Sequence, residues 1–208
     1  MLREQVIWVF FGLGNPGSFF LSFRHNLGKS ILRALKKRFS YLSRKEECKT
    51  SIKEKKIKEG RVSEFVCGSK RIFFFSSGGF MNNSGENLNF FLNRFLEENS
   101  LDLLNVHLLV LYDDMDLPLG RAKLSERRSS STHFGVASII EELGSIDFSH
   151  LRIGIGRWAN KEERAQWLLS SFSQEELSIL HSIQSMIFQL AEDWMNKTDV
   201  FFIKRRKR

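Results

Sequence analysis

Runs of apolar residues alternate along this chain with segments of helical spacing. Residues 6–11 form an uninterrupted apolar run with β-branched and aromatic members, which predicts a buried central strand. Three later runs predict further strands: residues 72–75, 106–112 and 151–155. Because helical segments separate the strands, the order of elements predicts an α/β fold with a mostly parallel sheet.

The helical segments carry apolar residues at every third or fourth position. Residues 28–39 predict a first helix on an otherwise basic segment, and residues 84–96 predict a second with Ser84 as its N-cap. A third helix ends before Gly144, which suits the C-cap position. Residues 177–194 predict one long amphipathic helix packed on the sheet.

Two segments have weaker patterns. Residues 48–68 alternate around a Glu-Gly turn, which predicts a lysine-rich hairpin at the sheet edge. Residues 121–132 predict a polar loop. We therefore expect an α/β single-domain sandwich over residues 1–203, with a central mixed, mostly parallel sheet flanked by helices, and a basic tail at 204–208.

Composition supports one folded domain. Of 208 residues, 42% are hydrophobic and 20 are phenylalanine, which argues against disorder across the whole chain. Cys48 and Cys67 are too few for a disulfide framework and lack metal-ligand spacing. The first apolar run resembles neither a signal peptide nor a membrane span, so we expect a cytoplasmic protein without a membrane partner.

The charge is clustered as well as large. The formal net charge is +8, and the segment from Arg33 to Arg71 carries 14 Lys or Arg against 5 Glu. The chain also ends in five consecutive cations, from Lys204 to Arg208. Such clusters predict a polyphosphate partner, and nucleic acid is favoured over a membrane because the basic stretches lack a strong apolar face.

The first strand ends in Gly-Leu-Gly-Asn-Pro-Gly, residues 12–17, which matches the glycine pattern of dinucleotide-binding sites. That site needs a helix opening at the third glycine and an acidic residue about 20 positions further on. Here Pro16 precedes the third glycine and Phe19 and Phe20 follow it, so no such helix is expected. The acidic position falls among Lys36, Lys37 and Arg38. We therefore interpret the segment as a tight turn and expect no cofactor.

Polar groups also follow the third strand. Asp113, Asp114 and Asp116 could hold Mg²⁺, since hard cations bind carboxylates. However, the other loops at strand ends carry no second carboxylate cluster. The alternative is that one aspartate orients a histidine while the others cap the turn before Pro118.

His25 follows the first strand-end turn among polar residues, which makes it a candidate general base near neutral pH. A carboxylate such as Asp113 would fix its tautomer and stabilise the imidazolium. Because no Ser or Cys lies in a nucleophile elbow, water is the expected attacking group. Asn15 and Asn82 can donate side-chain hydrogen bonds to a carbonyl or a developing oxyanion.

Taken together, these motifs resemble the bacterial peptidyl-tRNA hydrolase family. They are FGLGNPG, RHNLG, FMNNSG, LYDDMDLPLG, the step from His133 to Gly135, and LRIGIGR, and they occur in the family's order. The resemblance as a whole covers residues 6–194. The resemblance implies a monomeric α/β sandwich that cleaves the ester between a peptide and the 3′ ribose of tRNA. It also implies that the enzyme recycles tRNA in translation and needs no metal.

The resemblance assigns roles to matching positions. His25 would be the catalytic base and Asp113 its orienting partner. Asn15 and Asn82 would contact the peptide and hold the base, and Met81 would line the same groove.

A basic surface would hold the tRNA. Lys123 and Arg152 match positions that approach the acceptor-stem phosphates in the family. Ser125 stands where a second lysine is expected, and Arg127 and Arg128 could compensate for it. Phosphate contacts of this kind position RNA without reading its sequence.

Phe134 departs from the family pattern, in which an asparagine binds substrate at this position and helps to place the water. A phenyl ring makes none of the amide's hydrogen bonds. The Pro and Thr usual before the FMN motif are also replaced, by Ser77, Gly78 and Gly79. Two hypotheses follow: hydrolysis with His25 as base, or a weakened or inactive RNA-binding protein on the same scaffold, as in splicing-factor relatives of the family.

Overall fold

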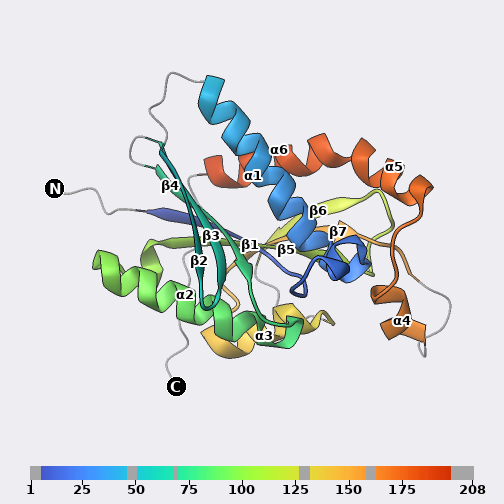
Figure 1. The fold of residues 1–208 in the computed structure, drawn as a ribbon, viewed down its shortest axis with the longest axis horizontal. Coiled ribbons are helices and arrows are strands. Elements are labelled where there is room, and N and C mark those ends of the chain that lie inside the picture. Colours follow the sequence, from blue (N-terminus) through green and yellow to red (C-terminus); the bar gives the residue numbers. More distant parts are fainter. Residues whose placement is uncertain (1–5, 46–50, 68–69, 127–131, 158–162, 198–208) are drawn as a thin grey trace.

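The computed structural model describes residues 6–45, 51–67, 70–126, 132–157 and 163–197. Its centre is a seven-stranded sheet of order β2-β3-β4-β1-β5-β7-β6 (Figure 1). The strands are β1 (Ile7–Gly12), β2 (Ser51–Ile57), β3 (Gly60–Cys67), β4 (Lys70–Ser77), β5 (Val106–Asp114), β6 (Ala122–Glu126) and β7 (Ser149–Gly154).

The middle of the sheet is parallel and its edges are antiparallel. Strand β1 pairs in parallel with β4 and β5, and β5 pairs in parallel with β7. The hairpin β2–β3 joins β4 on one edge, and β6 joins β7 on the other. The α/β sandwich with a mixed sheet is thus confirmed, and the carboxyl ends of β1, β4, β5 and β7 meet along one side.

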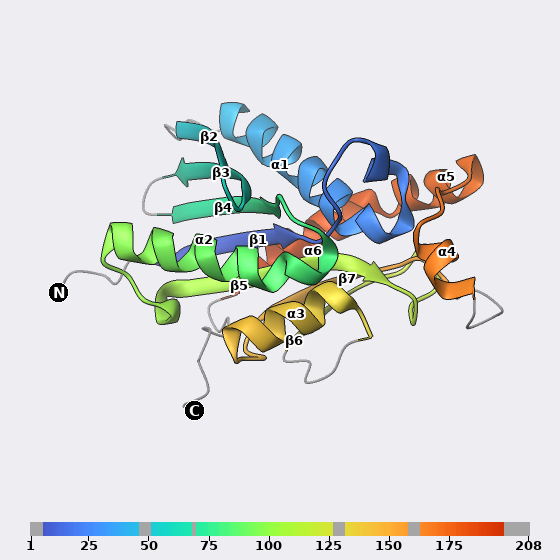
Figure 2. The same ribbon diagram turned by 60° about the horizontal axis from the view of Figure 1, so that its bottom comes forward.

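Helices cover both faces of the sheet (Figures 1 and 2). One face packs against α2 (Ser84–Asn99) and α3 (Phe134–Leu143), and the other against α1 (Leu27–Lys45) and α6 (Gln184–Asn196). Two shorter helices, α4 (Arg164–Leu168) and α5 (Gln174–Ser182), precede α6. Each face has its own apolar core because side chains of β1 alternate between them.

Most predicted elements are present, and three details differ. The predicted polar loop contains β6, whose short mixed sequence has no apolar run. The predicted long helix is divided, because α5 ends at Ser182 and α6 begins at Gln184. The N-cap of α2 is Asn83, and Ser84 lies in the first turn with a buried side chain.

The lysine-rich hairpin is confirmed as an edge of the sheet, with β2 as the outermost strand. Among the described residues, none of the helices is both long enough and apolar enough to cross a bilayer. The basic tail at 204–208 lies outside the described residues, as do Arg127 and Arg128.

Candidate active site

His25 lies in a 3₁₀ turn, Arg24–Asn26, between the strand-end turn after β1 and the start of α1. The turn is held close to the sheet, since the Leu13 N–H donates to the Leu111 carbonyl and the Lys29 N–H donates to the Leu13 carbonyl. Gly28 makes this approach feasible: a Cβ there would lie 2.1 Å from the Leu111 oxygen. The close packing of α1 on β5 places His25 beside the end of β5.

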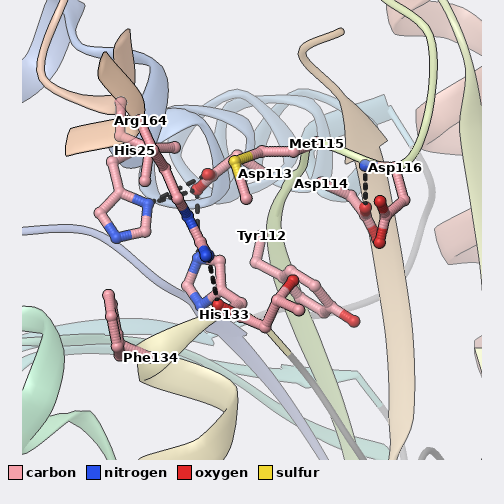
Figure 3. Close-up of a pocket in the computed structure, with 11 residues that line it drawn as sticks. His25, Tyr112, Asp113, Asp114, Met115, Asp116, His133, Phe134 and Arg164 are labelled. Atoms are coloured by element: carbon pink, nitrogen blue, oxygen red, sulfur yellow. Dashed lines mark hydrogen bonds and ion pairs between the residues drawn. The ribbon is translucent and has the colours of Figure 1, made fainter. Parts of the chain in front are cut away.

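Asp113, near the end of β5, lies between two imidazoles (Figure 3). His25 Nδ1 is 3.0 Å from Asp113 Oδ2, and His133 Nε2 is 3.2 Å from Asp113 Oδ1. All three side chains are buried. Sequence reasoning predicted the contact between His25 and Asp113, whereas it assigned His133 no role.

The surroundings fix the tautomers of both histidines. The Val136 N–H donates to His133 Nδ1, so the proton of this ring lies on Nε2 and is donated to Asp113. His25 then donates its Nδ1 proton to the other carboxylate oxygen, which leaves the lone pair on its Nε2. Figure 3 shows that nitrogen on the side of the ring away from Asp113. A neutral imidazole in this tautomer can accept a proton from water.

The electrostatics keep the carboxylate charged. Burial acts to raise the pKa of Asp113, but the neighbouring His133 and His25 hold it well below its usual range. Burial lowers the pKa of His133, and Asp113 opposes that change only in part. We therefore describe the centre near pH 7 as one anionic carboxylate held by N–H donors from two rings.

Asn15 is fixed by its neighbours in the strand-end turn. The Asn26 side chain accepts from the Asn15 N–H at 2.9 Å and donates to the Asn15 carbonyl at 3.0 Å. The Asn15 side-chain oxygen accepts the Met81 N–H at 3.0 Å. Because its oxygen is occupied, the Asn15 amide presents N–H donors to a ligand.

Two cavities meet at His25. One, of about 270 Å³, contains His25, Asp113 and His133, and the other, of about 580 Å³, is lined by Asn15, Met81 and Asn82 as well as His25. The structure thus brings all five predicted catalytic and substrate-binding residues to one place. Asn82 is exposed, and its backbone carbonyl accepts from Ser138, so its side chain is available to a ligand.

Phe134 and Arg164 line both cavities. The Arg164 guanidinium lies 5.8 Å from the centre of the Phe134 ring and donates to the Thr132 carbonyl at 2.7 Å. The Phe134 ring is 60% exposed. Phe134, which was predicted to lower the rate of hydrolysis, is therefore part of the cavity wall. Arg164 is a second wall residue, and no sequence motif indicated it.

The side chain of Asp114 has a structural role, whereas the side chain of Asp116 forms an exposed ion pair with Arg157 at 3.1 Å. Asp114 Oδ1 accepts the Asp116 N–H at 2.8 Å, which caps the turn before Pro118. Asp114 Oδ2 accepts from Arg152 Nε in a buried ion pair. Of the two alternatives for this cluster, the structure matches the one in which Asp113 contacts a histidine and an aspartate caps the turn, although Asp114 alone provides that cap.

Lys123 and Arg152 lie directly opposite each other on β6 and β7. Lys123 is exposed, whereas Arg152 is buried and its Nε is paired with Asp114. Because Lys123 is exposed, its ammonium group is accessible to a phosphate. The contact predicted for Arg152 stays a prediction, and the Asp114 pair reduces the charge that this residue can offer to RNA.

The ligand atoms of His25, Asp113 and His133 lie within 4.8 Å of one another, so these residues could hold a metal ion. Two of the contacts have hydrogen-bond lengths, and the Val136 N–H already selects the tautomer for hydrogen bonding. The distances therefore fit a hydrogen-bonded group in which Asp113 accepts from His25 and His133.

Arg24 joins the histidine turn to the C-terminal helices. Its guanidinium binds both carboxylate oxygens of Glu176, at 2.9 and 2.7 Å, and lies 3.6 Å from the centre of the Trp167 ring. The same contact lowers the pKa of Glu176. Because the buried Arg24 precedes His25 directly, its ion pair with the partly exposed Glu176 fixes the turn that carries the base. The RHNLG motif drew attention to Arg24, but its partner Glu176, which lies 152 residues further along the chain, could not be inferred from the sequence.

The family model described as peptidyl-tRNA hydrolase matches residues 9–206. The chain belongs to this family. Relatives include a peptidyl-tRNA hydrolase of Desulfitobacterium hafniense, 37% identical over 172 residues and covering 83% of this chain and 84% of that protein. Another, from Shouchella clausii, is 32% identical over 186 residues and covers 89% of this chain and 92% of that protein.

Solved structures of the family share the fold. A crystal structure of peptidyl-tRNA hydrolase from Acinetobacter baumannii has a TM-score of 0.69 at 21% identity and covers 94% of this chain and 93% of that chain. An Arg119Gln mutant from the same organism has a TM-score of 0.70 at 21% identity, covering 98% of this chain and all of that chain.

Proposed function

We propose that this chain hydrolyses the ester bond between peptide and tRNA, with His25 as the general base that activates water. Family membership supports the reaction, and the contact between His25 Nδ1 and Asp113 carries the assignment of the base. The second hypothesis, an RNA-binding protein without turnover, is not favoured, because the relatives named above are peptidyl-tRNA hydrolases.

The first step is attack of water on the ester carbonyl. His25 Nε2 takes a proton from the water as the new carbon–oxygen bond forms, and Asp113 stabilises the resulting imidazolium at 3.0 Å. General-base help of this kind contributes about 10²- to 10⁴-fold to the rate. His133 stabilises the same carboxylate from its other oxygen.

The tetrahedral intermediate carries negative charge on the former carbonyl oxygen. We assign the side-chain N–H groups of Asn15 to this oxyanion, since the Asn15 oxygen is already occupied by Met81. Collapse of the intermediate breaks the bond to the ribose oxygen, and the imidazolium of His25 returns its proton there. The products are a free peptide acid and tRNA.

The larger cavity suits the peptide because Phe80, Met81, Phe134 and Leu169 give it apolar walls. Asn82 at its rim would bind a peptide carbonyl. Lys123 and Arg152 would contact acceptor-stem phosphates from the far edge of the sheet. We also propose that the protein acts as a monomer in the cytoplasm.

The test is release of the peptide from N-acetyl-aminoacyl-tRNA by the purified protein, with the His25→Ala variant as control. We expect a rate at least 10²-fold above that of His25→Ala, with no change after treatment with EDTA. Equal rates would disprove the role of His25, and loss of activity with EDTA would contradict metal-free hydrolysis. Tight, strongly salt-dependent tRNA binding without turnover would instead support the second hypothesis.

A further inference from the structure

A third cleft, of about 550 Å³, lies beside the strand-end turn of Asn15, between α1, the hairpin β2–β3 and the end of β4. Figure 2 shows the hairpin and α1 side by side at this edge of the molecule. Six cations line it: Lys29, Arg33, Lys36, Lys56, Lys58 and Arg61. Of the described residues that line it, none carries a carboxylate.

The opposite face of the same hairpin is different. There Lys53 and Lys55 line a cleft with α2 in which Arg71 pairs with Glu64 and Arg94 with Glu98. Among the described residues, the ion pairs of the six cations involve Lys36 alone, which binds the exposed Glu54 at 2.9 Å. Among the described residues, two of the four cations that line the cleft with α2 are therefore paired with a carboxylate, whereas one of the six that line the cleft with α1 is paired.

The six cations of the cleft with α1 are costly to the fold. Lys56 and Arg61 are directly opposite each other in the antiparallel register, an arrangement that destabilises a sheet when the charges are alike. Lys29 is buried at the floor of the cleft, and burial together with the charges of Arg33 and Arg61 lowers its pKa to about 8. A bound anion would relieve the repulsion at all these positions.

Lys29 also has a donor to spare. Its ammonium donates to the Asn15 carbonyl at 3.3 Å and to the Ser77 carbonyl at 3.1 Å. An ammonium group has three N–H donors, so one remains for a ligand. The cleft thus combines a buried ammonium that has one unused donor with five further cations that are exposed or partly exposed.

We propose that this cleft binds the sugar-phosphate backbone of the tRNA substrate, as a second phosphate site separate from Lys123 and Arg152. The proposal rests on the proposed function for the identity of the RNA. The two regions lie on opposite edges of the sheet, with the site of His25 between them; β3 and β7 are four strands apart, or roughly 20 Å. RNA fits better than a membrane, since a flat bilayer cannot bring phosphates down to Lys29.

The test compares two double variants that each remove two cations from the same hairpin. Lys56→Ala with Arg61→Ala alters the cleft, and Lys53→Ala with Lys55→Ala is the matched control on the other face. Binding of fluorescently labelled deacylated tRNA is measured by anisotropy from low to high salt. We expect the cleft variant to bind about 10-fold more weakly and to lower the salt slope by about 1 to 2, with the control within twofold of wild type.

Unfolding distinguishes a binding defect from damage to the fold. Because a like-charge pair is removed, the cleft variant should unfold at or above the wild-type temperature. Equal loss of tRNA binding in both double variants would overturn the proposal, as would a loss confined to binding of anionic phosphatidylserine vesicles. Cleavage of an N-acyl-aminoacyl-adenosine ester by wild-type protein checks the proposed function separately, since that substrate has no RNA body to reach the cleft.

Discussion

His133 Nε2 lies 3.2 Å from Asp113 Oδ1, so the orienting carboxylate is shared between two imidazoles. The ring of His133 is 4.7 Å from that of His25, centre to centre, yet its Nδ1 is occupied by the Val136 N–H. His133 therefore acts on the base through Asp113, as a positioning residue.

Removing this donor should slow turnover without preventing binding. We expect His133→Ala to lower kcat about 10- to 100-fold, with KM within about threefold of wild type, because Asp113 loses one of its hydrogen bonds. His181→Ala is a control, since His181 is exposed on α5. A change in KM alone would contradict a positioning role.

Asp113→Asn should lower kcat about 10²- to 10⁴-fold, because an amide cannot stabilise the imidazolium of His25. It should also change the pH dependence of stability. The pKa of Asp113 is held below that of the unfolded chain, so its stabilising contribution is present above pH ~4 and is lost as the pH falls further. Chemical denaturation at pH 3 and pH 6 should show the variant losing less stability than wild type across this interval.

The sequence predicted the site better than it predicted the framework around it. Short motifs at strand ends identified His25, Asp113 and Asn15, because parallel strands deliver their carboxyl ends to one edge. The contacts that hold these groups were not predictable: Glu176 meets Arg24 across 152 residues, and such distant pairs leave no local pattern. Strand β6 was missed because its five residues are mixed in polarity.

Phe134 offers a direct test of the cavity wall. An amide at this position could donate a hydrogen bond to substrate or water, so Phe134→Asn should raise kcat about 10-fold or more. Phe90→Asn is a matched control, since Phe90 is 55% exposed on α2 and lines neither cavity at His25. An unchanged rate in Phe134→Asn would show that this residue does not reach the substrate.

Arg24 should contribute to stability as well as to activity. The Arg24 guanidinium is buried against Trp167 and binds the partly exposed carboxylate of Glu176, so Arg24→Ala removes two charged hydrogen bonds and a ring contact and should cost about 2 to 3 kcal/mol in the free energy of unfolding. Arg94→Ala breaks an exposed pair with Glu98 and should cost at most about 0.5 kcal/mol. Urea denaturation measures both. Similar losses of stability in the two variants would show that the contacts of Arg24 do not fix the histidine turn.

Lys29 should make stability rise at alkaline pH. Its pKa of about 8 in the folded chain lies below its usual value of 10.5, so the unfolded chain binds more protons between these values. The sign is therefore opposite to that of a lysine in a salt bridge: wild type gains stability relative to Lys29→Met as the pH rises from 7 to 10. The gain should reach about 2 to 3 kcal/mol. If the difference in stability between wild type and Lys29→Met does not change with pH, burial does not disfavour the ammonium. If phosphates of tRNA enter the cleft, added tRNA should favour the ammonium and so reduce the rise in this difference between pH 7 and pH 10.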